Sequence, residues 1–182
     1  MLETLITNKT RLKLLLKFFL NSNASSYLRN LETEFDESSN AIRIELNRFE
    51  EAGLLVSNSE RNRKIFRANV QHPLFSDIHN ILMKYLGFDQ IIDKLVQKLA
   101  GIKTAYIVGD FARGKDSKNI DLVLIGSEFD KIYLEHLISK VEGLIKREIR
   151  CLMLNEKDED QYISKYPEAF VLWKNDYKTV LS

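Results

Sequence analysis

Apolar residues recur at helical spacing through the first 70 residues. Leu12, Leu15, Leu16 and Phe19 predict a helix that Thr7-Asn8 caps and that ends near Leu20, and further apolar positions give this helix two apolar faces. Residues 21–26 are polar and predict a turn, and helices are predicted at 27–35 and 40–52. Gly53 ends the last of these helices. Two short strands, 54–57 and 65–68, are predicted on either side of a polar tip, 58–64.

A second pattern starts after His72-Pro73, where the residue before proline is pushed out of helical conformation. Two amphipathic helices follow, and Gly87 separates them. Their predicted buried positions are Ile78, Ile81, Leu82 and Tyr85 in the first helix, and Phe88, Ile91, Ile92, Leu95, Val96 and Leu99 in the second. Gly101 closes the second helix.

The remaining third of the chain alternates strands and helices. Short β-branched runs predict strands at 105–108 and 120–125, joined by a polar turn, and a third strand at 148–154. A helix is predicted at 129–146, with Ile132, Leu137, Val141, Leu144 and Ile145 inward. The acidic run 156–160 predicts a helix start, because negative charge suits a helix N-terminus. Residues 166–173 are expected to pack against the core, and they are assigned to no helix or strand. The fold class expected is therefore α+β with a small mixed sheet.

Composition narrows the functional classes. A chain of 182 residues with 45% hydrophobic content can form one or two domains, and its net charge of +1 gives no strong overall field. The single cysteine, Cys151, lies in an apolar run and is expected to pack in a core in a reducing compartment. Since no apolar run approaches 18 residues, we expect a cytoplasmic protein that makes no contact with a membrane.

Polar residues with DNA-reading chemistry remain exposed on the helix predicted at 40–52 and on the following hairpin. Arginine pairs with guanine, asparagine with adenine, and serine with phosphate. The hairpin carries basic residues suited to phosphate or minor-groove contact. The predicted DNA-binding residues are Ser39, Asn40, Arg43, Asn47, Arg61, Arg63 and Lys64.

The order helix, helix, turn, helix and two-stranded ribbon is that of a winged helix-turn-helix. The stretch SSNAIRIELNRFEEAGLL, followed by the basic ribbon and IFRANVQHPLF, resembles bacterial transcriptional regulators of the ArsR-like kind. It is similar to a group in which this domain precedes a minimal nucleotidyltransferase domain. The resemblance implies double-stranded DNA as the partner and a homodimer. The expected domains are 1–70, the winged helix-turn-helix; 71–101, linking helices; and 102–182, the nucleotidyltransferase-like domain.

The segment AYIVGDFARGKDSKNIDLVLIG carries the second half of that resemblance. Gly109 matches the family glycine, Ala112-Arg113-Gly114 the polar turn, and Asp121 the second metal carboxylate. The chain departs from the family at Asp110, where the family has serine, and at Asn119, where it has the first carboxylate; its turn is also about two residues shorter. In addition, Arg150 falls near the place of a third carboxylate. The nucleotide-like pocket implied by the resemblance comprises Gly109, Asp110, Arg113, Gly114, Lys115, Asn119 and Asp121.

Three hypotheses therefore stand side by side. The first is a DNA-binding regulator whose nucleotidyltransferase-like domain is inactive and serves dimerisation or ligand sensing. The second is an active Mg²⁺-dependent nucleotidyltransferase, in which Asp121 is catalytic and a small molecule or protein receives the nucleotide. The third is a module of the toxin–antitoxin type that binds only protein. No resident cofactor or metal is expected under the first hypothesis, because His72, His79, His136 and Cys151 lack ligand spacing.

Overall fold

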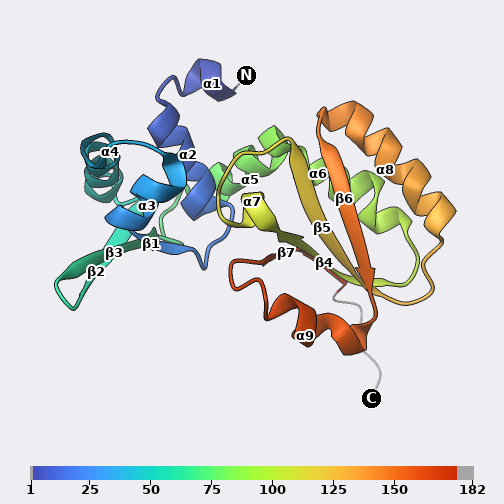
Figure 1. Ribbon diagram of the computed structural model, residues 1–182. Coiled ribbons are helices and arrows are strands. Elements are labelled where there is room, and N and C mark those ends of the chain that lie inside the picture. Colours follow the sequence, from blue (N-terminus) through green and yellow to red (C-terminus); the bar gives the residue numbers. More distant parts are fainter. Residues whose placement is uncertain (1, 176–182) are drawn as a thin grey trace. The chain divides into compact units, whose positions relative to one another are not determined.

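The computed structural model describes residues 2–175 and divides into two compact units (Figure 1). The first unit comprises the described residues up to Tyr85 together with Arg113–Asp116. The second comprises Leu86–Ala112 and the described residues from Ser117 onward. Helices and strands occur in both units, so the predicted α+β class is confirmed. Among the described residues, no helix is both long enough and apolar enough to cross a membrane.

Helices account for most of the first unit. They are α1 (Leu2–Leu5), α2 (Lys9–Phe19), α3 (Leu28–Phe35), α4 (Ser39–Glu51) and α5 (Phe75–Leu86), the last belonging to this unit up to Tyr85. Asn8 caps α2 by accepting a hydrogen bond from the Arg11 backbone N–H at 3.0 Å, as polar residues at this position commonly do. The two apolar faces predicted for α2 are both buried, since Leu14, Leu16, Phe18 and Phe19 are at most 1% exposed.

A three-stranded antiparallel sheet completes the first unit. Its strands are β1 (Ser25–Tyr27), β2 (Leu55–Glu60) and β3 (Arg63–Ala68), in the order β1-β3-β2. The prediction of a polar turn over 21–26 was wrong at its end, because Ser26 pairs with Phe66 across β1 and β3. The hairpin tip is also tighter than predicted. Arg61 and Asn62 alone form the turn, with φ of +46° and +63°, so Lys64 lies within β3.

The second unit contains a small mixed sheet, as predicted, but with four strands in place of the three predicted. Its strands are β4 (Ile102–Val108), β5 (Asn119–Gly126), β6 (Glu148–Leu154) and β7 (Phe170–Lys174), in the order β6-β5-β4-β7. Strands β5 and β6 run parallel, and the other pairs are antiparallel. Strand β7, which pairs with β4 through Phe170 and Ile107, was not predicted. Residues 109–112, predicted as part of a turn, form the short helix α7 (Gly109–Ala112).

Helices flank this sheet on both faces (Figure 1). One face carries α6 (Phe88–Lys94) and α8 (Lys131–Ile145), and the other carries α9 (Glu159–Ile163); the short 3-10 turns are η1 (Val96–Lys98) and η2 (Glu156–Asp158). The predicted inward stripe of α8 was partly wrong. Ile132 and Leu144 are 82% and 58% exposed, whereas Leu134, Leu137 and Val141 are buried. The spacing i, i+3, i+7 thus fits a stripe that begins two residues later.

The domain limits inferred from the sequence stay predictions. The stretch predicted as linking helices, 71–101, does not sort as one body, because α5 belongs to the first unit up to Tyr85 and α6 to the second. Residues 176–182 of the predicted C-terminal domain lie outside the described residues.

Candidate functional site

Helix α4 presents one polar face and buries the other. Ile42, Leu46 and Phe49 are at most 5% exposed, as predicted, and hold the helix on the first unit. Asn40, Arg43 and Asn47 are exposed. The Ser39 hydroxyl is already engaged, because it donates a hydrogen bond to the Glu32 carboxylate.

Residues from α3, α4 and β3 line a groove of about 480 Å³, which we call the basic groove. It brings together Arg43 and Asn47 from α4 with Arg63 and Lys64 from β3. The predicted Arg61 lies instead beside Tyr27, Glu60 and Arg63, at a neighbouring hollow. Four of the seven predicted DNA-binding residues therefore converge on a single groove, although they are 21 positions apart in the chain.

The basic groove also includes residues that the sequence did not single out. Arg29 and Asn30 line it from α3, and Tyr27 lines it from the end of β1. The sequence did not point to these residues, because it predicted a turn over 21–26, whereas residues 25–27 form a strand that pairs with β3. That pairing sets the first residues of α3 beside the hairpin.

The charges of the basic groove differ in how they are compensated. Lys64 pairs with Glu50 at 2.6 Å, and its ammonium lies 5.2 Å from the Phe66 ring centre. Within residues 2–175, Arg29, Arg43 and Arg63 form no ion pair. Three guanidinium groups are thus available to an anion.

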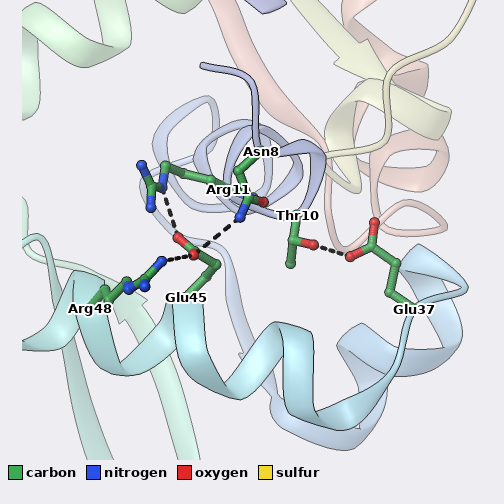
Figure 2. Close-up of polar contacts among 6 residues, drawn as sticks. All are labelled: Asn8, Thr10, Arg11, Glu37, Glu45 and Arg48. Carbon is green, nitrogen blue, oxygen red and sulfur yellow. Dashed lines mark hydrogen bonds and ion pairs between the residues drawn. The ribbon is translucent and has the colours of Figure 1, made fainter.

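A buried carboxylate fixes α4 against α2 (Figure 2). Glu45, whose side chain is 2% exposed, accepts hydrogen bonds from Arg11 at 2.7 Å, Arg48 at 2.5 Å and Asn8 at 3.2 Å. Burial alone would raise the pKa of Glu45, but the bonds from Arg11 and Arg48 outweigh it and leave the pKa lowered. A second contact, from Thr10 to Glu37, anchors the residues just before α4.

A pocket of about 300 Å³ opens in the second unit beside Gly109 and Asp121. Val108 pairs with Asp121 across β4 and β5, so Gly109 directly follows the paired position. A Cβ atom at Gly109 would clash with the Asp121 carboxylate, and the φ of +70° there also favours glycine. The match of Gly109 with a glycine-requiring turn therefore has a physical cause in this chain.

Strands β5 and β6 place four polar side chains in a two-by-two array, of which Asp121 and Arg150 line this pocket. Asn119 pairs with Glu148, and Asp121 with Arg150, along the parallel register. Hydrogen-bonding partners orient the Asn119 amide, which donates to Glu148 at 2.9 Å and accepts from Arg150 at 2.6 Å. The Arg150 guanidinium also lies 3.7 Å from the Asp121 carboxylate. The one guanidinium of the array therefore contacts both the amide and one of the two carboxylates.

This array does not fit a Mg²⁺ site of the two-carboxylate type. The Asp121 carboxylate already faces a guanidinium, and Asn119 contributes a neutral oxygen that Arg150 occupies. Throughout residues 2–175, no three His, Cys, Asp or Glu side chains are grouped to hold a metal ion. The ring of His79 contacts the Phe19 carbonyl, and His72 accepts from the Leu74 N–H.

Two aromatic side chains and a thiol complete the pocket. The rings of Tyr162, in α9, and Tyr166, in the following turn, are tilted with their centres 5.2 Å apart, and a hydrogen bond of 3.3 Å joins their hydroxyls. The hydrogen bond that Tyr162 donates to Tyr166, followed by burial, raises the pKa of Tyr162 to about 12. Burial raises the pKa of the Cys151 thiol to about 12, so this cysteine is not activated as a nucleophile.

The other predicted pocket residues lie elsewhere. Of the described residues, Asp110, Arg113, Gly114, Lys115 and Asn119 do not line the 300 Å³ pocket. Arg113–Asp116 belong to the first unit by their contacts. Gly114 has a φ of +79°, and a Cβ there would clash with the Lys17 backbone, which accounts for this second glycine.

Comparisons with known proteins found partial overlaps with solved structures. No family model and no curated protein matches the sequence. A Sulfolobus solfataricus protein described as a nucleotidyltransferase aligns at TM-score 0.37 and 19% identity, covering 55% of this chain and 89% of its own. The complex of the Shewanella oneidensis HEPN toxin with the MNT antitoxin aligns at 0.39 and 18%, covering 51% and 74%. A toxin–antitoxin structure with AMP-PNP aligns at 0.40 and 16%, covering 49% and 74%. TM-scores of 0.40 and below do not establish a shared fold.

Proposed function

We propose that this protein is a transcriptional regulator that binds double-stranded DNA through the first unit, with α3 and α4 as the helix-turn-helix and the β2–β3 hairpin as the wing. The observation that carries the proposal is the convergence of Arg43 and Arg63, neither of them in an ion pair, on the basic groove. DNA affinity depends first on neutralising phosphates with free cations. Two arginines from different elements, held without a partner, are suited to that role.

The exposed polar residues of α4 and of the hairpin are proposed to contact different parts of the DNA. Asn40, Arg43 and Asn47 lie on the outer face of α4, where they can reach base edges in the major groove. Arg61 at the hairpin turn reaches toward the backbone or minor groove. The Glu45 contacts hold α4 in place on α2, so that the helix is presented rigidly (Figure 2). A homodimer reading two half-sites follows from this mode of binding.

The test is a titration of fluorescent duplex DNA at low and moderate salt. The parent should bind and weaken as salt rises, and Arg43→Ala/Arg63→Ala should lose about 30-fold or more in affinity. Arg67→Ala is the matched control, because Arg67 is an exposed cation of β3 that does not line the basic groove. An equal loss in the control would remove the special role of the groove. A parent without duplex affinity at low salt would overturn the regulator proposal and favour a module that binds only protein.

For the second unit we propose a nucleotidyltransferase-like domain that binds a nucleotide-like ligand or a second copy and performs no transfer. The support is the array in which Arg150 faces Asp121 and Asn119. A guanidinium at this position favours an anionic ligand without a bridging metal. Binding of a fluorescent adenine nucleotide should therefore persist in EDTA, and it should weaken in Arg150→Ala.

Nucleotidyl transfer is the second candidate function, and the exposed part of Asp121 favours it. The carboxylate is 31% exposed and opens into the pocket beside Gly109, where a ligand can reach it. Labelled ATP incubated with the protein and a cell extract tests it. Label transfer that requires Asp121 and survives the control Asp93→Ala, an exposed carboxylate of α6, would establish transfer. Absence of transfer, or transfer unchanged in Asp121→Ala, would exclude this role for Asp121.

A further inference from the structure

The floor of the basic groove is apolar, which the proposed DNA contacts do not use. Leu46 and Phe66 are 1% and 4% exposed and lie deepest, and Tyr27 and Leu28 extend the floor. The volume of about 480 Å³ falls among those of small-molecule sites, which combine apolar walls with a few convergent polar groups. A duplex presents a convex, charged backbone and gains little from a concave apolar floor.

The rim of the same groove is strongly cationic. Arg29, Arg43 and Arg63 come from three different elements, and their guanidinium groups form no ion pair among the described residues. Of the described residues that line the groove, Glu32 alone is acidic, and it accepts a hydrogen bond from Ser39. Its charge is therefore partly engaged. An apolar floor beneath free guanidinium groups is complementary to a molecule with a flat apolar body and a negative end.

We infer that the basic groove is a binding site for a small aromatic anion. Its ring system lies on Leu46, Phe66 and Tyr27, and its carboxylate, sulfonate or phosphate pairs with Arg43 or Arg63. Because those arginines also carry the proposed DNA contact, the ligand and DNA compete. Only the competition rests on the proposed function; the binding itself does not.

A fluorescent aromatic sulfonate, 1-anilinonaphthalene-8-sulfonate, tests the binding with the full chain. It should bind with a stoichiometry of one per protein, measured by fluorescence and calorimetry. The uncharged N-phenyl-1-naphthylamine has the same rings without the sulfonate and should bind about tenfold more weakly, the size of one charge-assisted contact. Equal affinity of the two dyes would overturn recognition of the anion.

Substitutions place the dye in the groove. Arg43→Ala/Arg63→Ala should weaken the sulfonate about tenfold, with little effect on the neutral dye, and Arg67→Ala should change neither. Asn30→Trp keeps the charge but fills the groove from an exposed position of α3, so it should block both dyes. Circular dichroism confirms that each variant is folded. Undiminished binding in Asn30→Trp would overturn the inference.

A second apolar surface of the first unit provides the internal control. It includes Leu5, Ile78 and the exposed Ile81, beside Arg11 and Arg48. Loss of dye binding in Ile81→Lys, with normal binding in Arg43→Ala/Arg63→Ala, would place the dye there and overturn the inference.

Competition is measured last, with the duplex that the parent binds. The sulfonate should shift the DNA titration to higher protein concentration, and the neutral dye should shift it less. If the parent binds the dye in the groove but no DNA, the proposed function fails while the ligand site stands. If DNA binds equally at saturating dye, the shared site is overturned.

Discussion

Among the described residues, the arginines of the basic groove in the first unit lack ion-pair partners, whereas the arginine of the pocket in the second unit has one. In the groove, Arg43 and Arg63 line an apolar hollow without any ion pair among the described residues. In the pocket, Arg150 faces Asp121 and donates to Asn119. A cation without a partner gains most from an incoming anion, whereas a compensated one must first give up its existing contacts.

Because its arginines are unpaired within the described part of the chain, the groove of the first unit is the more favourable of the two sites for binding an anion. The pocket has a shape fixed by Gly109 and a satisfied polar array, which suits weak or metal-free ligand binding. The groove keeps free charge at a surface, which proteins maintain at some cost in stability when it serves binding. Four measurements test this difference between the two regions.

The largest effect is expected at the pocket backbone. Gly109→Ala should destabilise the second unit by about 3 kcal/mol, because its Cβ meets the Asp121 carboxylate at a positive φ. Trp173, the single tryptophan, lies in β7 and reports on this unit by fluorescence during urea unfolding. Gly143→Ala is the control, since nothing lies within 4 Å of its position in α8, and it should stabilise by about 0.5–1 kcal/mol. Equal effects would show that the pocket geometry is not tight.

The second-largest effect is expected at Glu45, which holds α4 against α2. Glu45→Gln should cost about 2 kcal/mol, because the charged acceptor of Arg11 and Arg48 is lost. The folded-state pKa of Glu45 is lowered, so its contribution is present above the unfolded-state pKa and is lost as pH falls through the folded-state value. Urea unfolding followed by circular dichroism should show a smaller loss of stability on acidification in Glu45→Gln than in the parent. An unchanged acid dependence would contradict this assignment.

Within the groove, substitution of an unpaired cation should reduce DNA affinity more than substitution of a paired one. Arg63→Ala should weaken DNA about tenfold, and Lys64→Ala only about twofold, because Lys64 is already paired with Glu50. Glu50→Gln should then strengthen DNA binding by releasing Lys64. Anisotropy titrations at one salt concentration measure all three. If Lys64→Ala cost as much as Arg63→Ala, charge compensation would not distinguish them.

The smallest effect is expected at the compensated arginine. Arg150→Ala should change the stability of the second unit by less than about 1 kcal/mol, since its side chain is 64% exposed and surface ion pairs contribute little. Its DNA affinity should match that of the parent. A large loss of DNA binding in Arg150→Ala would remove the contrast between the two regions.

Several elements were predictable because local chemistry decides them. The strand at 148–154 is mostly apolar, and its observed bounds match the prediction. The helix predicted at 40–52 has its apolar stripe at helical spacing and a serine cap, and the observed α4 differs by one residue at each end. In both cases neighbouring residues alone favour one structure.

Other elements depended on partners distant in the chain. Strand β7 is short, and it becomes a strand because β4 offers a free edge. Strand β1 is made of two serines and a tyrosine, and pairing with β3 overrides their preference for a turn. In α8 the periodicity allowed a stripe through Ile132, but the sheet covers only the turns around Leu134, Leu137 and Val141.

The amino-acid sequence was enough to predict the α+β class, most helices and strands, and the residue types available for binding. Hydrophobic periodicity acts over neighbouring positions, so it can be read along the chain. Which charged side chains lie close together depends on the tertiary structure. Arg43 and Arg63 are 20 positions apart, yet they share one groove, and Arg150 reaches Asp121 only because β5 and β6 run parallel in register. Charge compensation depends on distance in space, which no spacing along the sequence specifies.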